Sequence, residues 1–134
     1  MDPERGLLDT SVVVALDRLD LARLPTVSAI STLTLAELAS GPHAAADVSE
    51  RARRQERVQD VEAKIEALPF DAECARAYSR IYAEVAAAGR KPRGPRLIDL
   101  MIAATALALV LPLYTLNADD LRGLDELIEI VDLG

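Results

Sequence analysis

Short apolar runs alternate with longer stretches of helical periodicity along this chain. Apolar residues recur at positions 12, 13, 16 and 19, which is the spacing of one helix face. Helices are predicted over residues 11–19, 32–38, 47–68, 71–88 and 95–110, with a turn and a short helix over residues 117–127. Strands are predicted over residues 6–9, 26–30, 69–70, 111–115 and 128–133. Helices and strands therefore alternate from one end of the chain to the other.

Local signals fix several of these boundaries. The dipeptide Gly41-Pro42 should end the helix over residues 32–38. Asp47 has the spacing of a capping residue relative to Glu50, and Asp71 should cap the helix that follows it. Pro95 lies where the first residue of a helix is expected. Short strands separated by helices predict an α/β fold with a short, largely parallel central sheet.

Four acidic residues lie in or beside apolar stretches, where a carboxylate is costly. They are Asp9, Glu37, Asp99 and Asp120. Asp9 ends the first predicted strand, and Asp120 follows the strand over residues 111–115. In a parallel sheet the carboxyl ends of the strands meet at one edge, which is where open α/β sheets bind ligands. We therefore expect these acids to converge on one site.

Three of these acids have structural alternatives. Glu37 follows Thr34 at capping-box spacing, and Asp120 follows Asn117 at the spacing of an Asn cap. Backbone donors in the first turn of a helix could satisfy Asp99. Asp119 precedes Asp120 directly, so the choice among Asp119, Asp120 and Asn117 stays open at the sequence level.

Converging carboxylates point to a hard cation. Two of them about 4 Å apart repel by roughly 4 kcal/mol at an effective dielectric of about 20, and a divalent cation removes that penalty. Ligation by oxygen alone favours Mg²⁺ or Mn²⁺. His43 and Cys74 are too few for a zinc site, and we expect His43 on the surface and Cys74 in the core.

Composition narrows the setting of this chemistry. The chain has 134 residues, enough for one domain over residues 1–134, and its residues are 51% apolar and 3% aromatic, so the core must be aliphatic. A single cysteine excludes an internal disulfide, and Pro112 interrupts the longest uncharged run. With neither a signal peptide nor a spanning helix of about 20 apolar residues, we expect a cytoplasmic protein without membrane contact.

The net charge of −7 argues against tight, nonspecific nucleic-acid binding through global charge, although it does not exclude a nucleic-acid enzyme. Basic residues nevertheless gather in two places. The first cluster is either a solvated helix face or a binding surface; it comprises Arg51, Arg53, Arg54 and Arg57. The second cluster, just before Asp99, is better placed to meet phosphate; it comprises Arg90, Lys91, Arg93 and Arg96.

Four segments together resemble the PIN-domain family, and in particular the VapC-like ribonuclease toxins of toxin–antitoxin pairs. In chain order they are residues 8–11 (LDTS), 34–38 (TLAEL), 98–106 (IDLMIAATA) and 113–121 (LYTLNADDL). The last segment departs from the family pattern, because Leu116 replaces the usual Arg and Leu121 the usual Phe. Val110 also stands where a glycine often ends the preceding helix.

The resemblance implies a three-layer α/β/α sandwich and a Mg²⁺- or Mn²⁺-dependent endoribonuclease. By position, Asp9, Asp99 and Asp120 would hold the metal, and Glu37 would ligate it or orient the attacking water. Thr10 and Ser11, which follow Asp9 in the chain, would support these acids with their hydroxyl groups. Single-stranded or loop RNA, such as that of tRNA or rRNA, is the expected substrate.

The same resemblance implies partners. VapC-like toxins are commonly dimers, and a small cognate antitoxin covers their helices. The helices over residues 47–68 and 71–88 are then the expected antitoxin-facing surfaces, unless their apolar stripes are buried in the core. The rival hypothesis is a non-catalytic PIN-like binding module that only engages an antitoxin-type partner. A metal-dependent nuclease that acts on DNA is a third hypothesis.

Overall fold

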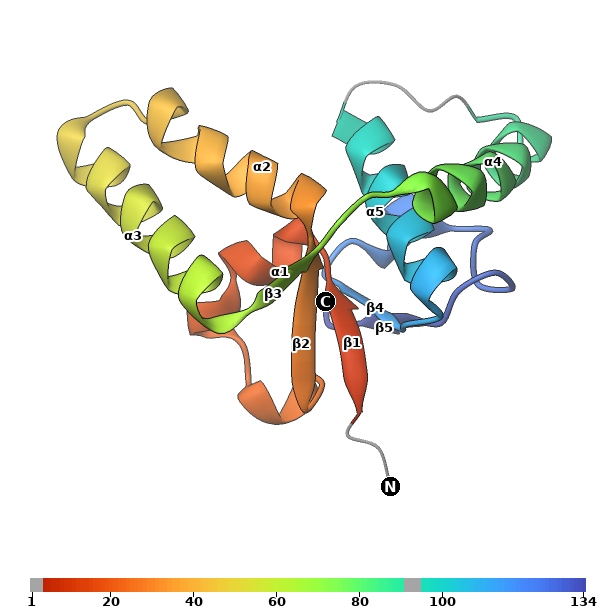
Figure 1. Cartoon of the computed structure of the whole chain (residues 1–134), viewed down its shortest axis with the longest axis horizontal. Helices are drawn as coiled ribbons and strands as arrows, with labels where there is room; N and C mark the ends of the chain where they lie inside the picture. The colour runs from red at the N-terminus through yellow and green to blue at the C-terminus, as the bar shows by residue number, and fades with distance from the viewer. Residues whose placement is uncertain (1–3, 91–94) are drawn as a thin grey trace.

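Five parallel strands form the centre of the fold, in the order β3-β2-β1-β4-β5 (Figure 1). The computed structural model describes residues 4–90 and 95–134. The strands are β1 (Arg5–Leu8), β2 (Val27–Ser31), β3 (Glu66–Leu68), β4 (Leu113–Thr115) and β5 (Ile130–Asp132). The predicted α/β class with a short parallel sheet is therefore confirmed.

Helices precede or follow every strand. They are α1 (Thr10–Val14), α2 (Thr32–Ser40), α3 (Val48–Lys64), α4 (Ala72–Ala87) and α5 (Pro95–Leu109), with the 3-10 turns η1 (Leu16–Arg18), η2 (Leu21–Arg23), η3 (Gly41–Ala44) and η4 (Ala118–Leu121). Both predicted caps are present, because Asp47 Oδ1 accepts from Glu50 N at 2.7 Å and Asp71 Oδ1 from Cys74 N at 3.1 Å. In the described part of the chain, none of the helices has the length and apolar content that a membrane crossing requires.

Alternation along the strands divides the core into two layers, because successive strand residues point to opposite faces of a sheet. Leu7 and Leu113 pack with the buried faces of α4 and α5. Their neighbours Leu8 and Tyr114 pack instead with residues of α1, α2 and α3. Figure 1 shows α3 on one side of the sheet and α4 with α5 on the other. This arrangement is the predicted three-layer sandwich.

Three predicted elements were wrong in their bounds. The helix over residues 47–68 ends at Lys64, and the strand predicted at residues 69–70 lies instead at Glu66–Leu68. Residues 65 and 68 continue the helical spacing, but Ile65 ends α3 as its C-cap, and Leu68 instead pairs with Ser31 of β2. The helix predicted over residues 11–19 also ends early, at Val14, and the 3-10 turn η1 follows it.

Gly6 lets the central strand approach β4 closely. A Cβ atom on Gly6 would lie 2.4 Å from Tyr114 Cε1 and 3.0 Å from Pro25 Cγ. The Tyr114 ring is 4% exposed, and its hydroxyl donates to Glu4 Oε1 at 2.9 Å. A side chain at position 6 would therefore displace a ring that both packing and a hydrogen bond hold in place.

The end of α5 explains why a glycine is expected at position 110. Val110 N donates to Leu107 O at 3.2 Å and Leu111 N to Ala106 O at 3.0 Å, which is a Schellman motif. The motif places Val110 at a φ of 54°. Only glycine adopts this left-handed region without steric cost, so the β-branched Val110 is strained there.

Candidate functional site

The order of the strands creates a switch point beside β1. The chain leaves β1 toward β2 and β3 on one side, whereas β4 and β5 lie on the other. Ligands of open parallel sheets bind beyond the carboxyl ends of the strands at such a point. Asp9 directly follows β1, and η4, which contains Asp120, follows β4 after two residues. The structure thus brings the ends of these two strands to the same edge of the sheet, as expected.

Asp9 is a buried carboxylate at this edge, with 9% of its surface exposed. It caps α1, which begins one residue earlier than predicted. Asp9 Oδ1 accepts from Val12 N at 3.2 Å and from Ser11 Oγ at 2.5 Å. Among the described residues Asp9 is the only charged side chain that is buried. Its Oδ2 atom receives no hydrogen bond from the described residues and is available to a cation.

Hydrogen bonds join Asp9 to the end of β4. Ser11 Oγ, which donates to Asp9, also accepts from Leu116 N at 3.1 Å. Asp9 N donates to Tyr114 O at 3.0 Å. The fully buried Thr115 then fixes the next turn, because its Oγ1 accepts from Asn117 N at 2.9 Å. The backbone on both sides of the switch point is therefore held in one geometry.

A second group of polar side chains joins α1 to α2. Thr10 Oγ1 donates to Glu37 Oε1 at 2.6 Å and lies 3.1 Å from Thr34 Oγ1, with which it shares a hydrogen bond. Ser31 caps α2 by accepting from Leu33 N at 3.0 Å, so the alternative in which Thr34 and Glu37 form a capping box is wrong. The fully buried Thr34 instead supports the Thr10–Glu37 contact.

Asp120 lies in the exposed turn η4. Asn117 precedes this turn but makes no side-chain capping hydrogen bond to the described residues, so the proposed Asn cap is not formed. Asp119, Asp120 and Asp132 line a hollow of about 270 Å³ beside the ends of β4 and β5. Asp9 is not among the residues that line this hollow, although both acids follow strands that end at the same edge of the sheet.

Asp99 is half-buried in α5, which packs against α2 and α4. Glu37 and Thr10 line a different hollow, of about 430 Å³, between α1, α2 and α3. In residues 4–90 and 95–134, no three His, Cys, Asp or Glu side chains come close enough together to hold a metal ion. The donor chemistry of the four acids fits a hard cation, whereas their convergence on one ion stays a prediction.

Burial changes the titration of Tyr114, the residue that precedes Thr115 in β4. The buried position, followed by the hydrogen bond to Glu4, raises the pKa of Tyr114 to about 12. His43 is exposed and Cys74 is buried, as expected. Burial also raises the pKa of the Cys74 thiol above its usual value. Neither His43 nor Cys74 belongs to the candidate site.

The sequence did not indicate Thr34 and Thr115 as site residues, yet both are fully buried and hydrogen-bonded beside it. The sequence did contain a signal for them, because each is a hydroxyl residue at a position that the periodicity assigns to the core.

The first basic cluster lies on α3. The prediction that the second cluster meets phosphate depends on Lys91 and Arg93, which lie outside the described residues.

The model of the PIN domain family matches residues 7–127. Ribonuclease VapC5 from Mycobacterium tuberculosis is 40% identical to this chain over 126 residues, which cover 92% of this chain and 90% of the relative. The crystal structure of the toxin–antitoxin complex VapBC-5 from the same species contains a similar chain, with a TM-score of 0.84, 40% identity and coverage of 97% and 99% of the two chains.

A more distant structure has the same architecture. The DNA-bound VapBC from Salmonella typhimurium matches with a TM-score of 0.72 and 26% identity, over 98% of this chain and 99% of the other. The matches extend across the sheet and both helical layers, so the similarity includes the switch point at which Asp9 lies.

Proposed function

The chain belongs to the PIN-domain family, and we propose that it is a metal-dependent endoribonuclease toxin restrained by a cognate antitoxin. The similarity to a ribonuclease over nine tenths of both chains supports this function. One observation in the fold links this function to a particular residue. Asp9 is buried at the switch point, with Oδ1 held by two donors and Oδ2 open to a ligand. Such a carboxylate is suited to a cation rather than to a purely structural role.

In the proposed mechanism, Asp9, Asp99 and Asp120 would hold one or two Mg²⁺ or Mn²⁺ ions. When bound, such an ion would supply a water of lowered pKa and polarise the scissile phosphate. Glu37 orients the attacking water, and the hydrogen bond from Thr10 fixes the rotamer of Glu37 for this task. Ser11 and the amide of Val12 hold Asp9 in place. The protein thus contributes a rigid arrangement of oxygen donors.

The proposed substrate is single-stranded or loop RNA of the tRNA or rRNA class, which places the activity in the cytoplasm. A chain with a net charge of −7 cannot hold a duplex through global charge. Sequence-specific recognition of RNA generally uses single strands and loops, where bases are accessible. Local contacts near the site must then supply the affinity.

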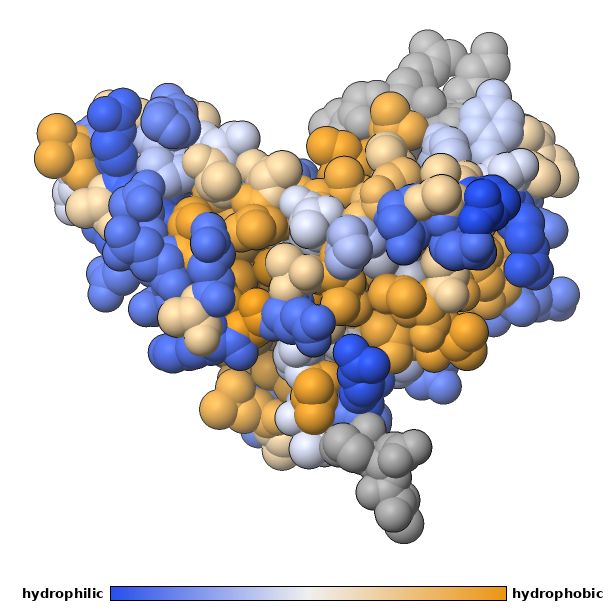
Figure 2. All heavy atoms as spheres, in the orientation of Figure 1, coloured by the Kyte–Doolittle hydropathy of each residue, from blue (hydrophilic) through white to orange (hydrophobic). Residues whose placement is uncertain are grey.

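The proposed partner is a small antitoxin, and the similar chain of the VapBC-5 complex supports this. A homodimer or a toxin–antitoxin hetero-oligomer is the expected assembly. The apolar stripe of α3 is not available to the antitoxin, because Val58 and Val61 are 7% and 5% exposed and belong to the core. The buried stripe of α4 is excluded for the same reason. A partner would therefore meet the outer faces of these helices, which are largely hydrophilic on α3 (Figure 2).

One observation favours a second candidate, the non-catalytic PIN-like binding module. Within the part of the chain that the structure describes, no three acidic side chains lie close enough together to hold a metal ion. A protein with this arrangement could keep the fold and its partner without binding metal firmly. Metal affinity and RNA cleavage therefore distinguish the two candidates.

The test is cleavage of a mixed tRNA and rRNA pool by the purified protein, with Mg²⁺ or Mn²⁺ against EDTA. Wild type is compared with Asp99→Asn and with Asp125→Asn, an exposed acid that provides the same change in charge. We expect discrete metal-dependent fragments from wild type and Asp125→Asn, and none from Asp99→Asn. An absence of cleavage by wild type, together with no thermal shift on addition of metal, would support the binding module.

A further inference from the structure

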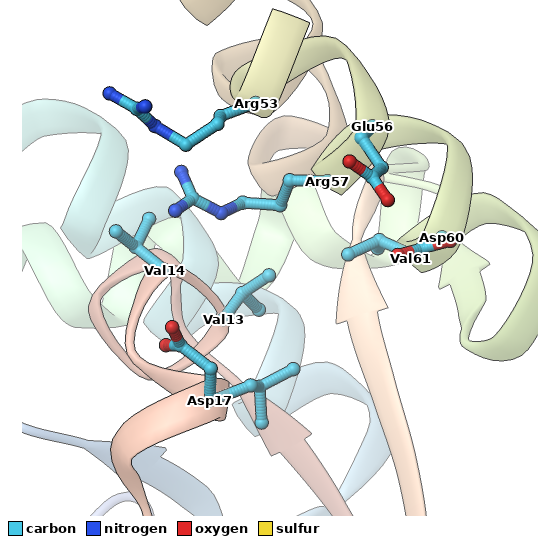
Figure 3. A pocket seen from close by; sticks show the side chains of 9 residues that line it. Val13, Val14, Asp17, Arg53, Glu56, Arg57, Asp60 and Val61 are labelled. Atoms are coloured by element: carbon cyan, nitrogen blue, oxygen red, sulfur yellow. The ribbon is translucent and has the colours of Figure 1, made fainter. Parts of the chain in front are cut away.

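Two adjoining hollows lie between α1 and α3. The first is the hollow of about 430 Å³ that Thr10 and Glu37 line. The second, of about 320 Å³, extends past Val13 toward Asp17 (Figure 3). Both hollows share the side chains of Val14 and Arg57. A ligand that reaches Glu37 along α3 would therefore pass Arg57.

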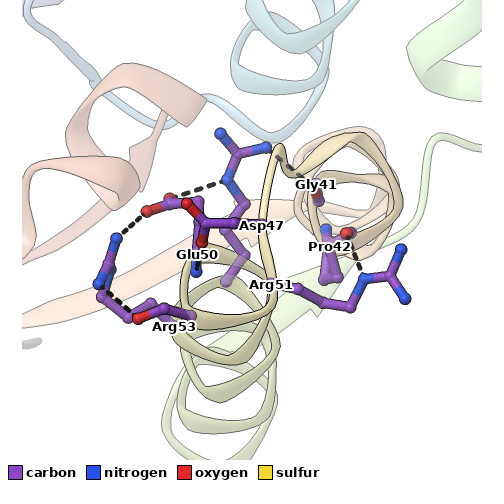
Figure 4. Close-up of polar contacts among 8 residues, drawn as sticks. Gly41, Pro42, Asp47, Glu50, Arg51 and Arg53 are labelled. Atoms are coloured by element: carbon purple, nitrogen blue, oxygen red, sulfur yellow. Dashed lines mark hydrogen bonds and ion pairs between the residues drawn. The ribbon is translucent and has the colours of Figure 1, made fainter.

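Neighbouring arginines of α3 already have partners. Glu50 accepts from Arg53, and it accepts from Arg54 Nε at 3.0 Å (Figure 4). Arg54 also donates to Gly41 O at 2.9 Å, and Arg51 donates to Pro42 O at 3.2 Å. The contacts with Arg53, then with Arg54, lower the pKa of the Glu50 carboxyl below its usual value. Arg51 and Arg54 thus attach α3 to η3.

Arg57 differs from these three residues. It is half-buried, yet it forms no hydrogen bond or ion pair with the described residues. Figure 3 shows its side chain leaving α3 and extending toward Val14, with the guanidinium group on the same side as that of Arg53. A partly desolvated guanidinium without an acidic partner is costly, and a bound anion would remove this cost.

We propose that Arg57 is a positioning residue that binds a backbone phosphate of the RNA strand beside the cleavage site. This inference rests on the proposed nuclease function. Guanidinium groups bind phosphate through two parallel hydrogen bonds, which fixes orientation as well as supplying charge. Val14, which is 37% exposed, provides an apolar surface next to this group that a ribose or base can cover. In a chain with a net charge of −7, such a local contact supplies what global charge does not.

The first arm of the test measures RNA binding without cleavage. Fluorescence anisotropy in EDTA, on the Asp9→Asn background, follows a single-stranded RNA oligonucleotide at several salt concentrations. Adding Arg57→Gln should weaken binding severalfold and reduce the slope of log K against log salt by about 0.7, the value for one phosphate contact on a single strand. Arg80→Gln, an exposed arginine on α4, makes the same change in net charge and should leave the slope unchanged.

The second arm measures cleavage kinetics in the catalytically intact protein. Arg57→Gln should raise KM by about tenfold and change kcat by less than twofold, since the contact forms before and during the reaction. Arg57→Lys should recover part of the loss, because it restores the charge but not the two-pronged contact. Circular dichroism establishes that each variant is folded.

The outcomes separate this inference from the proposed function. If wild type cleaves RNA while Arg57→Gln keeps its KM and its salt slope, the inference is overturned and the nuclease stands. If wild type binds RNA in the predicted manner without cutting it, the nuclease fails and the phosphate contact stands. A variant that binds RNA normally but loses affinity for an acidic partner protein would assign Arg57 to that partner instead.

Discussion

Ser11→Ala is the substitution that tests most closely how the fold supports the site. The Ser11 hydroxyl donates to Asp9 Oδ1 at 2.5 Å and accepts from Leu116 N at 3.1 Å. It therefore connects the carboxylate at the end of β1 with the backbone that follows β4. Alanine removes both hydrogen bonds and leaves the shape of the backbone otherwise unchanged.

The two lost contacts set the magnitude. A hydrogen bond to a charged group contributes about 1.5–3 kcal/mol, and an amide left without an acceptor costs about 1–3 kcal/mol when buried. Ser11 and Leu116 are half-buried, so water replaces part of each contact. We expect a loss of about 2 kcal/mol in the free energy of unfolding, or roughly 6–8 °C in Tm for a domain of this size. Loss of a residue that orients a metal ligand typically lowers activity about 10–100-fold.

Urea denaturation and steady-state RNA cleavage measure these two effects separately. Ser79→Ala provides the matched control, because Ser79 is exposed on α4, and it should change neither quantity. The reasoning would be refuted if Ser11→Ala lost stability as predicted but kept full kcat at a temperature where it is folded. Asp9 would then need no orientation by Ser11, and the bridge would serve the fold alone.

Three further predictions concern the scaffold. Val110→Gly should stabilise the protein by about 1 kcal/mol, because it relieves the strained φ of 54° at a side chain that is 88% exposed; an unchanged or lower Tm would show that the valine is not strained. Gly6→Ala should cost about 1–3 kcal/mol through the clash with Tyr114, and a double-mutant cycle with Tyr114→Leu should show strong coupling; additive effects in denaturation would contradict the close approach. Because the pKa of Tyr114 is raised to about 12, the unfolded chain loses the phenol proton first, so stability present below pH 10 should fall by roughly 2–3 kcal/mol as the pH rises toward 12. Tyr114→Phe should flatten this dependence in pH-resolved denaturation, and a slope equal to that of wild type would exclude Tyr114 as its source.

Elements with strong local signals could be predicted from the sequence. Asp47, Asp71 and Pro95 each begin a helix where capping and proline chemistry place them. The strand Glu66–Leu68 was missed because its apolar positions also fit a helix. Its pairing with β2 depends on contacts between distant parts of the chain, and a local pattern does not contain them. The order of the strands is unpredictable from periodicity for the same reason.

The sequence predicted which residues belong to the candidate site better than it predicted the contacts among them. Asp9 stood out because a carboxylate next to a buried strand is costly, and the structure places it at the switch point. The Thr10–Glu37 hydrogen bond joins residues 27 positions apart, which only the pairing of β1 with β2 brings together. Spacing alone instead suggested a capping box for Glu37, and Ser31 takes that role.

A crystal structure with Mn²⁺, analysed by anomalous diffraction, would test the central claim most directly. The claim is that the carboxylates at the carboxyl ends of β1 and β4 hold the catalytic cation. We expect an anomalous peak coordinated by the Asp9 carboxylate, together with Asp99 and Asp120, and no such peak in Asp9→Asn crystals grown in the same way. A wild-type map without a peak at Asp9 under saturating Mn²⁺, or with one only at another site, would contradict the account.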